Sequence, residues 1–473
     1  MTHQGPAAGS VLVDDIAVLA TMDEDLGEIE HAFVQIEDGM VTAVGPSPAP
    51  APRQPCPRIR ATGLVGLPGL VNAHHHLFQS YTRALSACQD QPLAGWLDAQ
   101  YPWWEQMTAE ASYWAALAGL AELALAGCGT SADHHFAIPR SGDGMAAMLT
   151  AVADAARQVG VRVQLYPGAV DPGLHPLAGD WALAAEPDRV LAGMEETVRQ
   201  LHDSSPGAMT RVGLAPDWLS PGSAPLMAAV RDLARELGVR RHTHAAQTAS
   251  EVAYCRAAYQ RTPVERLDEL GWLGADVHLA HAVQLTDADI GLLAGTGTAV
   301  AHCPSSNMRL AAGIARITDL RSASVPVGLG VDGSASNDAG NLLTEARQAL
   351  LLARLRDRDC LLSARTALQL ATAGGADSLG WPEIGRLRPG ARGDIALFAL
   401  DGVTGAGFEN DLVAALALSG PHRARHLLVN GMPVVAEGHL VGVAEAEVRR
   451  EHRRVQATLR SRLSGSQVSE DSQ

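Results

Sequence analysis

The sequence predicts an α/β protein: a (β/α)8 barrel of the TIM type with a small discontinuous β-sandwich domain built from both chain ends. Three observations predict it. Short apolar segments alternate with stretches of helical periodicity through the middle of the chain. Strand-like alternation punctuated by Gly and Pro occupies both ends. The length of 473 residues suits one large barrel with an accessory domain.

The sandwich is expected from residues 1–65 and 385–443. Short strands alternate with turns over the first of these segments, and a proline-rich loop follows at "GPSPAPAPRQPCP". Strand patterns return after about Gly385, and "VNGMPVV" predicts a hairpin. Residues 444–473 are expected to form a helix to about Leu463, followed by a disordered polar tail, "SGSQVSEDSQ".

The barrel is expected from residues 66–384. Eight apolar segments there end in polar residues, and helical patterns such as "PLMAAVRDLARELG" separate most of them. In order, the eight are "LPGLVNAHHH", "GTSADHH", "VRVQLYPG", "RVGLAPDW", "VRRHTHAAQ", "VHLAHAVQ", "TAVAHCPSSN" and "PVGLGVDGSAS".

Composition excludes several classes of function. The net charge is −16 without a basic patch, which argues against nucleic-acid or anionic-membrane binding. The chain contains no lysine, so Schiff-base, Walker-lysine and carboxylated-lysine chemistry are excluded. Its six cysteines are scattered and predict reduced thiols. With no secretory signal and no long apolar run, we expect a cytoplasmic protein.

Three consecutive histidines follow the first barrel strand. Side chains alternate along a strand, so His74 and His76 are expected to point into the barrel and His75 away from it. The carboxyl ends of the strands carry the active sites of TIM barrels. Two imidazoles at that end can share one metal ion.

Other strand ends carry similar side chains. His242 and His244 end the fifth segment, His281 ends the sixth, and Asp332 ends the eighth. Imidazole and carboxylate groups suit zinc or another divalent cation of similar character. The pattern therefore predicts a metal centre, whereas His134 and His135 at the second strand end are expected to line or support it.

The ordered motifs "PGLVNAHHH", "HTHAAQ", "HLAHAV", "AHCPSSN" and "GLGVDGSASN" resemble the amidohydrolase superfamily. "SYTRAL", "WLDAQYPWWEQMTAE" and "TSADHHF" narrow the resemblance to its cytosine/guanine deaminase-like branch, which includes 8-oxoguanine deaminases, isoxanthopterin deaminases and s-triazine hydrolases. The resemblance covers essentially the whole chain.

The resemblance implies one divalent metal ion, most often zinc and in some members Fe²⁺. Its implied ligands are His74, His76, His244 and Asp332. His281 would orient the metal-bound water or polarise the tetrahedral intermediate, and Asp332 would also carry the proton of the water. The resemblance thus implies attack by metal-bound hydroxide on a ring carbon.

Gln247 departs from the family pattern HxHxxE, whose glutamate protonates the ring nitrogen beside the attacked carbon. Glutamine can donate a hydrogen bond but cannot transfer a proton. His281 or Asp332 therefore covers the protonation step, or the substrate requires only a hydrogen bond at that atom, or a different bond is cleaved.

Candidate substrate contacts are Gln79, Asn307, Trp103 and Asp217. Gln79 matches a substrate-binding glutamine in the 8-oxoguanine-type subgroup, Asn307 could face the ring, and Trp103 with Trp104 could stack on a planar heterocycle. Asp217 and Tyr166 occupy positions where some relatives have histidine and arginine. These differences disfavour a guanine-like or 8-oxoguanine substrate.

The sequence therefore predicts a metal-dependent hydrolase that deaminates an aminated planar N-heterocycle: an oxidised purine, a pterin or a triazine. Alternatives are a dealkylaminating or dechlorinating s-triazine hydrolase, a cyclic amide hydrolase, and a metal-binding relative without turnover. The expected partners are the small heterocyclic substrate and a second copy of the chain in a homodimer, with no nucleic acid and no membrane.

Overall fold

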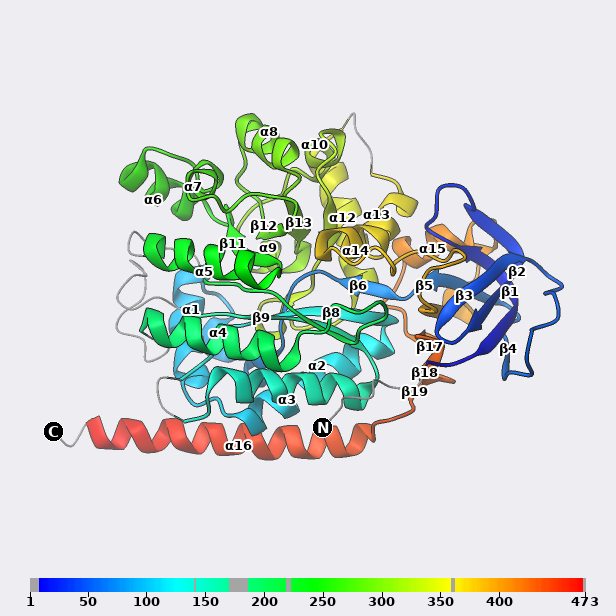
Figure 1. Ribbon diagram of the computed structural model, residues 1–473, viewed down its shortest axis with the longest axis horizontal. Coiled ribbons are helices and arrows are strands. Elements are labelled where there is room, and N and C mark those ends of the chain that lie inside the picture. Colours follow the sequence, from blue (N-terminus) through cyan, green and yellow to red (C-terminus); the bar gives the residue numbers. More distant parts are fainter. Residues whose placement is uncertain (1–7, 140–141, 170–185, 218–222, 359–361, 471–473) are drawn as a thin grey trace.

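The computed structural model describes residues 8–139, 142–169, 186–217, 223–358 and 362–470 (Figure 1). Strands and helices alternate through the middle of the chain, and further strands lie at both ends, so the protein is α/β as predicted. Of the helices in these ranges, none is both long and apolar enough to span a bilayer.

Strands from both chain ends form one nine-stranded sheet, coloured blue and orange at one side of Figure 1. Antiparallel pairing of β5 with β16 joins the N-terminal strands to the C-terminal ones. The predicted hairpin is confirmed as β17–β18, and the positive φ angles of Asn430 and Gly431 suit its two-residue turn. The strands are β1 (Val11–Ala20), β2 (Glu28–Glu37), β3 (Met40–Pro46), β4 (Arg58–Arg60), β5 (Leu64–Pro68), β16 (Ile395–Ala399), β17 (Ala424–Val429), β18 (Met432–Ala436) and β19 (His439–Leu440).

Parallel strands make up the middle of the chain, in two four-stranded sheets of order β10-β9-β8-β6 and β11-β12-β13-β14 and a short β15-β7 pair. Each of the eight segments predicted from the sequence contains a strand, and the first and the last contain two each. The strands are β6 (Leu70–Asn72), β7 (His75–His76), β8 (Cys128–His135), β9 (Arg162–Pro167), β10 (Thr210–Val212), β11 (Arg241–Ala245), β12 (Val277–His281), β13 (Ala299–His302), β14 (Val327–Leu329) and β15 (Asp332–Gly333).

Helices surround these parallel strands in Figure 1. Their N-termini are capped by short polar side chains near the site, as where Thr248 accepts from the N–H of Glu251 at the start of α6. The helices are α1 (Leu93–Trp104), α2 (Ala109–Leu125), α3 (Met145–Val159), α4 (Pro187–Leu201), α5 (Ser223–Leu237), α6 (Ala249–Tyr259), α7 (Pro263–Glu269), α8 (Asp287–Thr296), α9 (Pro304–Arg309), α10 (Ile317–Ser322), α11 (Ser334–Asn337), α12 (Leu342–Arg356), α13 (Ala364–Leu370), α14 (Ala373–Leu379), α15 (Leu412–Leu418) and α16 (Glu445–Glu470), with short 3-10 turns η1 (Leu77–Thr82), η2 (Ser86–Cys88), η3 (Val403–Gly405) and η4 (Phe408–Asn410).

Helix α16 is longer than the sequence predicted. It continues to Glu470, through most of the polar stretch that was expected to be disordered. Each residue added to an existing helix contributes another backbone hydrogen bond, so a helix can extend through polar residues. The last three residues of that stretch, 471–473, lie outside the described residues.

A buried polar cluster ties the parallel strands to the nine-stranded sheet. The guanidinium of Arg162 in β9 forms an ion pair with Asp394 and donates to the Asn430 side chain. Asp394 also accepts from the backbone N–H of Asn430 at 2.8 Å. All three residues are buried, so the charges are paired rather than left unsatisfied.

The five cysteines within the described ranges are free thiols, as expected; the sixth, Cys360, lies outside those ranges.

Candidate metal centre and active site

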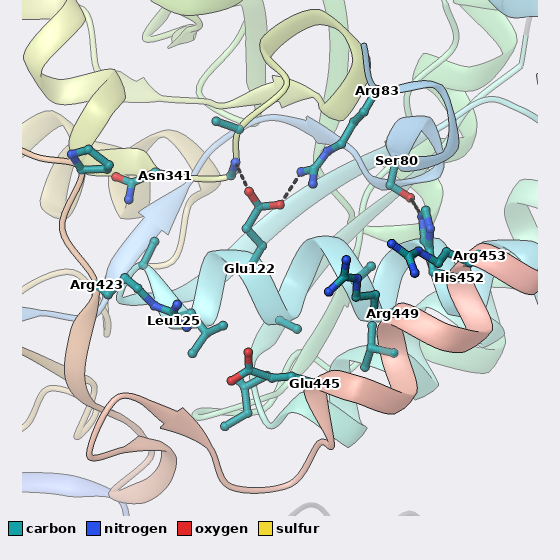
Figure 2. A pocket seen from close by; sticks show the side chains of 18 of the residues that line it. Ser80, Arg83, Glu122, Leu125, Asn341, Arg423, Glu445, Arg449, His452 and Arg453 are labelled. Carbon is teal, nitrogen blue, oxygen red and sulfur yellow. Dashed lines mark hydrogen bonds and ion pairs between the residues drawn. The ribbon is translucent and has the colours of Figure 1, made fainter. Parts of the chain in front are cut away.

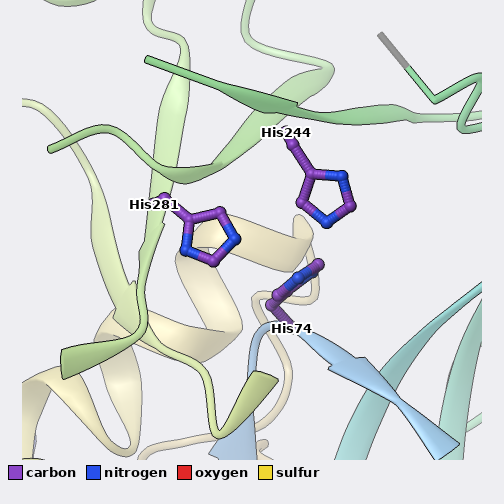
Figure 3. Close-up of side chains that lie close together, drawn as sticks. All are labelled: His74, His244 and His281. Carbon is purple, nitrogen blue, oxygen red and sulfur yellow. The ribbon is translucent and has the colours of Figure 1, made fainter. Parts of the chain in front are cut away.

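Histidine rings from three separate segments converge on one point at the carboxyl ends of the parallel strands. Figure 3 shows the rings of His74, His244 and His281 facing a common space. Ligand atoms of these three lie within 4.8 Å of one another, and so do those of His74, His76 and Asp332. Parallel pairing of β7 with β15 sets Asp332 opposite His75 and Gly333 opposite His76, which brings the two segments together.

The donor atoms in this cluster have the spacing of a metal site. His76 Nε2 lies 3.1 Å from His244 Nε2, and Asp332 Oδ1 lies 3.2 Å from His74 Nε2 and 3.4 Å from His76 Nε2. Ligand atoms about 2.1 Å from a tetrahedral ion are roughly 3.4 Å apart. His74 Nε2 is buried and has no hydrogen-bond partner among the described residues. An orphaned buried nitrogen beside three other donors fits a divalent cation.

The far side of each imidazole is held in place. His76 Nδ1 donates to the carbonyl oxygen of His134 at 2.7 Å, and His244 Nδ1 donates to Asp217 Oδ1 at 3.0 Å. A partner on Nδ1 directs Nε2 at the metal position and is typical of metal-binding histidines. Asp217, expected to contact substrate, thus also orients His244.

His242 performs the same task for His74. Its Nδ1 must donate to the His278 carbonyl oxygen 2.9 Å away, since a carbonyl only accepts. Its Nε2 is then free to accept from His74 Nδ1 at 2.9 Å. This chain of hydrogen bonds ends with the lone pair of His74 Nε2 directed at the centre. The "HTH" motif therefore supplies a ring at the centre, His244, and one behind it, His242.

Burial sets the charges of these groups. It lowers the pKa of His281 to about 4 and that of His74 well below its ordinary value, which keeps both in the neutral form that binds metals. Burial also opposes ionisation of Asp332, but the proximity of His74, His281 and His76 holds its pKa well below the usual range. His74, His76 and His281 therefore present neutral imidazoles beside a carboxylate. Burial also opposes the charged form of His244, but its hydrogen bond with Asp217 and the nearby charge of Asp332 raise its pKa.

Two of the residues that converge here have a left-handed backbone conformation. The φ angles are 74° at His281 and 58° at Asp332, uncommon values for residues other than glycine. Such conformations cluster at functional sites, where the surrounding structure holds a side chain in place against local strain.

A cavity of about 540 Å³ opens beside the cluster. Gln79, Gln247 and Asp217 line it together with His76, His244, His281 and Asp332. All seven are expected from the sequence as site residues, and the fold brings them together from separate segments. The volume suits a drug-sized planar molecule.

Two expected substrate contacts lie elsewhere. Trp103 does not line this cavity, whereas Trp104 does, since consecutive helical residues project about 100° apart. Trp103 faces the guanidinium of Arg460 in α16 instead. Asn307 is fully buried behind His281, where its Oδ1 accepts from His281 Nδ1 at 3.0 Å.

Two further residues near the site are not among those expected from the sequence. Glu251 lines the cavity, and its carboxylate accepts from the backbone N–H groups of Ala246 and Gln247 at 2.8 and 2.7 Å. The spacing of Thr248 and Glu251 in "TASE" is a capping-box pattern and is the signal that could have found it. Ser306 in α9 donates to Asp332 Oδ2, a contact that no local pattern reveals.

A buried carboxylate and several neutral imidazoles beside a small-molecule cavity define a class of protein, the metal-dependent hydrolases with a parallel-strand scaffold. Comparison with known proteins identifies the family. Residues 65–431 match the model of the amidohydrolase family, and the chain belongs to that family.

Three relatives show how closely the chain follows this family. It is 40% identical over 431 residues to 8-oxoguanine deaminase of Pseudomonas aeruginosa, covering 90% of this chain and 94% of that one. It is 33% identical over 471 residues to isoxanthopterin deaminase from an unknown prokaryotic organism, covering 94% and 96%. An atrazine chlorohydrolase of Arthrobacter aurescens TC1, crystallised with zinc, superposes with a TM-score of 0.87 at 30% identity over 94% of this chain and all of that one.

Proposed function

We propose that the protein hydrolytically deaminates an aminated planar N-heterocycle: an oxidised purine, a pterin or a triazine. One observation carries the proposal: four imidazoles and a carboxylate converge at the wall of a cavity that also presents the amides of Gln79 and Gln247. Amide groups suit the alternating donors and acceptors on the edge of a heterocycle. The relatives named 8-oxoguanine deaminase and isoxanthopterin deaminase support this substrate class.

His74, His76, His244 and Asp332 would hold one divalent cation, with zinc the first choice and Fe²⁺ the second. Such a cation lowers the pKa of bound water to about 7 and so supplies a nucleophile at neutral pH. A second ion bridged by a carboxylated lysine is excluded because the chain has no lysine.

We propose that Asp332 moves a proton during the reaction. Its Oδ1 faces His74 and His76, while its Oδ2 accepts from Ser306 and, at 3.0 Å, from Ser336. A carboxylate held ionised in this way can accept a proton from water and return it to the departing amine.

We propose that His281 polarises the atom that accepts negative charge. Asn307 fixes its Nδ1, so Nε2 faces the centre, 4.0 Å from Asp332 Oδ2. Gln247 lines the same cavity, and we propose that its amide hydrogen-bonds the ring atom beside the attacked carbon.

A second candidate function is hydrolysis of a chloro- or alkylamino-triazine, and Gln247 favours the chlorinated substrate. Chloride leaves without being protonated, so a hydrogen-bond donor that cannot transfer a proton is adequate there. The chlorohydrolase of similar structure supports this candidate.

A screen of heterocycles separates the candidates. The metal-loaded enzyme is incubated with aminated purines, pterins and triazines and with chlorotriazines, and ammonia, alkylamine and chloride are measured. We expect ammonia from at least one aminated purine, pterin or triazine. Chloride or alkylamine alone would favour the second candidate, and ring opening of a cyclic amide without ammonia would contradict the proposal.

We further propose that the two parallel sheets close into one barrel. The Leu214–Arg241 bridge links them on one side, and the Ala73 N–H donates to the Leu329 carbonyl at 2.8 Å on the other. We also propose that the nine-stranded sheet folds over its own apolar core as the expected sandwich. The proposed domain limits are residues 65, 385 and 443. We further propose that the enzyme is a homodimer.

A further inference from the structure

We propose that a second hollow, apart from the metal centre, binds a small organic anion that carries a phosphate or carboxylate group on an apolar body. The hollow has a volume of about 670 Å³ and lies between α2, α16 and the loop before β17 (Figure 2). It shares no lining residue with the cavity at the metal centre. The proposal is independent of the reaction proposed above.

Arginines dominate the charge of this hollow. Arg449 and Arg453 come from α16, Arg423 lies across the hollow, and Arg83 is at its upper edge in Figure 2. The net charge of the chain is −16, so this cluster of positive charges is opposite in sign to the protein as a whole. A concave surface of one sign concentrates ions of the opposite sign.

Three of these arginines have no carboxylate partner. Two acidic residues line the hollow. One of them, Glu122, forms an ion pair with Arg83 and accepts a hydrogen bond from the Gly340 N–H. The guanidinium groups of Arg423, Arg449 and Arg453 form no hydrogen bond or ion pair with any described residue, and the second acid, Glu445, does not pair with them.

The neighbouring arginines of α16, about 100° further around the helix, provide an internal comparison. Arg450 pairs with Glu451 at 2.9 Å, and Arg454 pairs with Glu451 at 2.7 Å and with Glu110. In the segment "VRREHRRV", the arginines that do not line the hollow are therefore neutralised and those that line it are not. Like charges four residues apart on a helix repel each other, and an anion between Arg449 and Arg453 would relieve that repulsion.

The floor of the hollow is apolar, which indicates a ligand with an apolar body. Ala118, Ala121 and Leu125 of α2 face it, together with Val448 of α16 and Leu440. Guanidinium groups bind phosphate and carboxylate groups with paired hydrogen bonds. The volume lies within the usual range for small-molecule sites.

The hollow is rigidly built. Val448, Val455 and Leu459 anchor α16 in the core, and His452 packs on Tyr81 while its Nε2 lies 3.0 Å from Ser80 Oγ. The part of α16 that carries Arg449 and Arg453 is therefore fixed against the core.

Calorimetry with phenyl phosphate tests the proposal on the full-length, metal-loaded protein. We expect one phenyl phosphate per chain and weaker binding of inorganic phosphate, which cannot use the apolar floor. Sodium benzoate, titrated in the same way, tests whether the hollow binds a carboxylate group on an apolar body. The double variant R449Q/R453Q should bind phenyl phosphate at least about tenfold more weakly, since each charged hydrogen bond contributes about 1.5–3 kcal/mol. The matched control R450Q/R454Q removes the same charge from the same helix and should change affinity less than about twofold.

Several results would overturn the proposal. These are unchanged binding in R449Q/R453Q, an equal loss in R450Q/R454Q, or no saturable binding of either phenyl phosphate or benzoate. R423Q, on the separate wall, should also weaken binding and gives an independent test if the double variant fails to fold. A change of oligomeric mass in R449Q/R453Q without phenyl phosphate binding to the wild type would assign the hollow to contact between copies of the chain instead.

Discussion

At the scale of single residues, each imidazole of the site matters through both of its nitrogens. Nε2 faces the centre, and Nδ1 is held by an acceptor that belongs to another part of the chain: the His134 carbonyl for His76, Asp217 for His244 and Asn307 for His281. These outer partners decide which tautomer each ring adopts and where its lone pair points.

Asp217→Ala tests this role of the outer partners. Without the carboxylate, His244 loses its orienting acceptor, and we expect the affinity for zinc to fall roughly 10–100-fold. The measurement is competition with a chelator of known affinity. Asp98→Ala removes an exposed carboxylate of α1 and serves as the control. Equal zinc affinity in Asp217→Ala and the control would show that Asp217 does not support the centre.

Gln247→Glu tests the departure from the family motif. A glutamate at 247 would lie beside the buried carboxylate of Glu251, which already accepts the Gln247 N–H. We expect weaker substrate binding, because an amide donor is replaced by a group that leaves the substrate acceptor unpaired, at a cost of about 1–3 kcal/mol. The kcat and KM are measured separately on the substrate found in the screen. A large gain in kcat with unchanged KM would instead show that the natural reaction needs an acid at this position.

At the scale of secondary-structure elements, the ends of the parallel strands bring the site together, and the short helices after them hold it. Glu345 of α12 links two of these helices: it accepts from the N–H and hydroxyl of Ser305 in α9 and from the Asn337 amide in α11. Their neighbours Ser306 and Ser336 both donate to Asp332.

Stability should depend on pH through Glu345. Burial raises its pKa from 4.5 to about 7, and the nearby charge of Asp332 adds to this effect. The folded protein therefore holds a proton there that the unfolded chain releases above about pH 4.5. The resulting stabilisation, on the order of 3 kcal/mol, is complete below pH 4.5 and is lost as the pH rises through 7.

Urea unfolding between pH 5 and pH 8 measures this dependence. We expect the free energy of unfolding to fall with pH in the wild type and to fall less steeply in Glu345→Gln, which cannot ionise. Glu236→Gln, an exposed position in α5, should keep the wild-type slope. A Glu345→Gln variant with the wild-type slope would rule out this role for Glu345.

Much of the element pattern could be predicted from the sequence because periodicity is local. The eight strand segments and the hairpin at Asn430 follow from alternation and turn residues. The helical extension to Glu470 could not be predicted, because the polar residues of the tail carry no apolar period.

The site was predictable only in part, for a related reason. Period-two alternation suffices to place His74 and His76 together, but the partners of their rings, such as His242 and His244, lie 168 residues away in the sequence. The choice between Trp103 and Trp104 depends on the rotation of one helix, and Asn307 behind His281 depends on how α9 packs.

At the scale of the whole molecule, the protein is a scaffold that brings distant segments to one point. Strands β7, β11, β12 and β15 each contribute to the metal centre or flank it, and none of these segments could form it alone. The buried Arg162–Asp394 pair then ties the parallel strands to the sheet made from the two chain ends. The metal centre can therefore form only when these parts of the fold are assembled.

Metal content per chain tests the proposed metal centre directly. The protein is equilibrated with zinc, freed of loosely bound ions and analysed by mass spectrometry of the elements. We expect one zinc ion per chain in the wild type and in His439→Ala, an exposed histidine of β19, and loss of the ion in His244→Ala. Two ions per chain, or a full complement of zinc in a folded His244→Ala variant, would contradict the account.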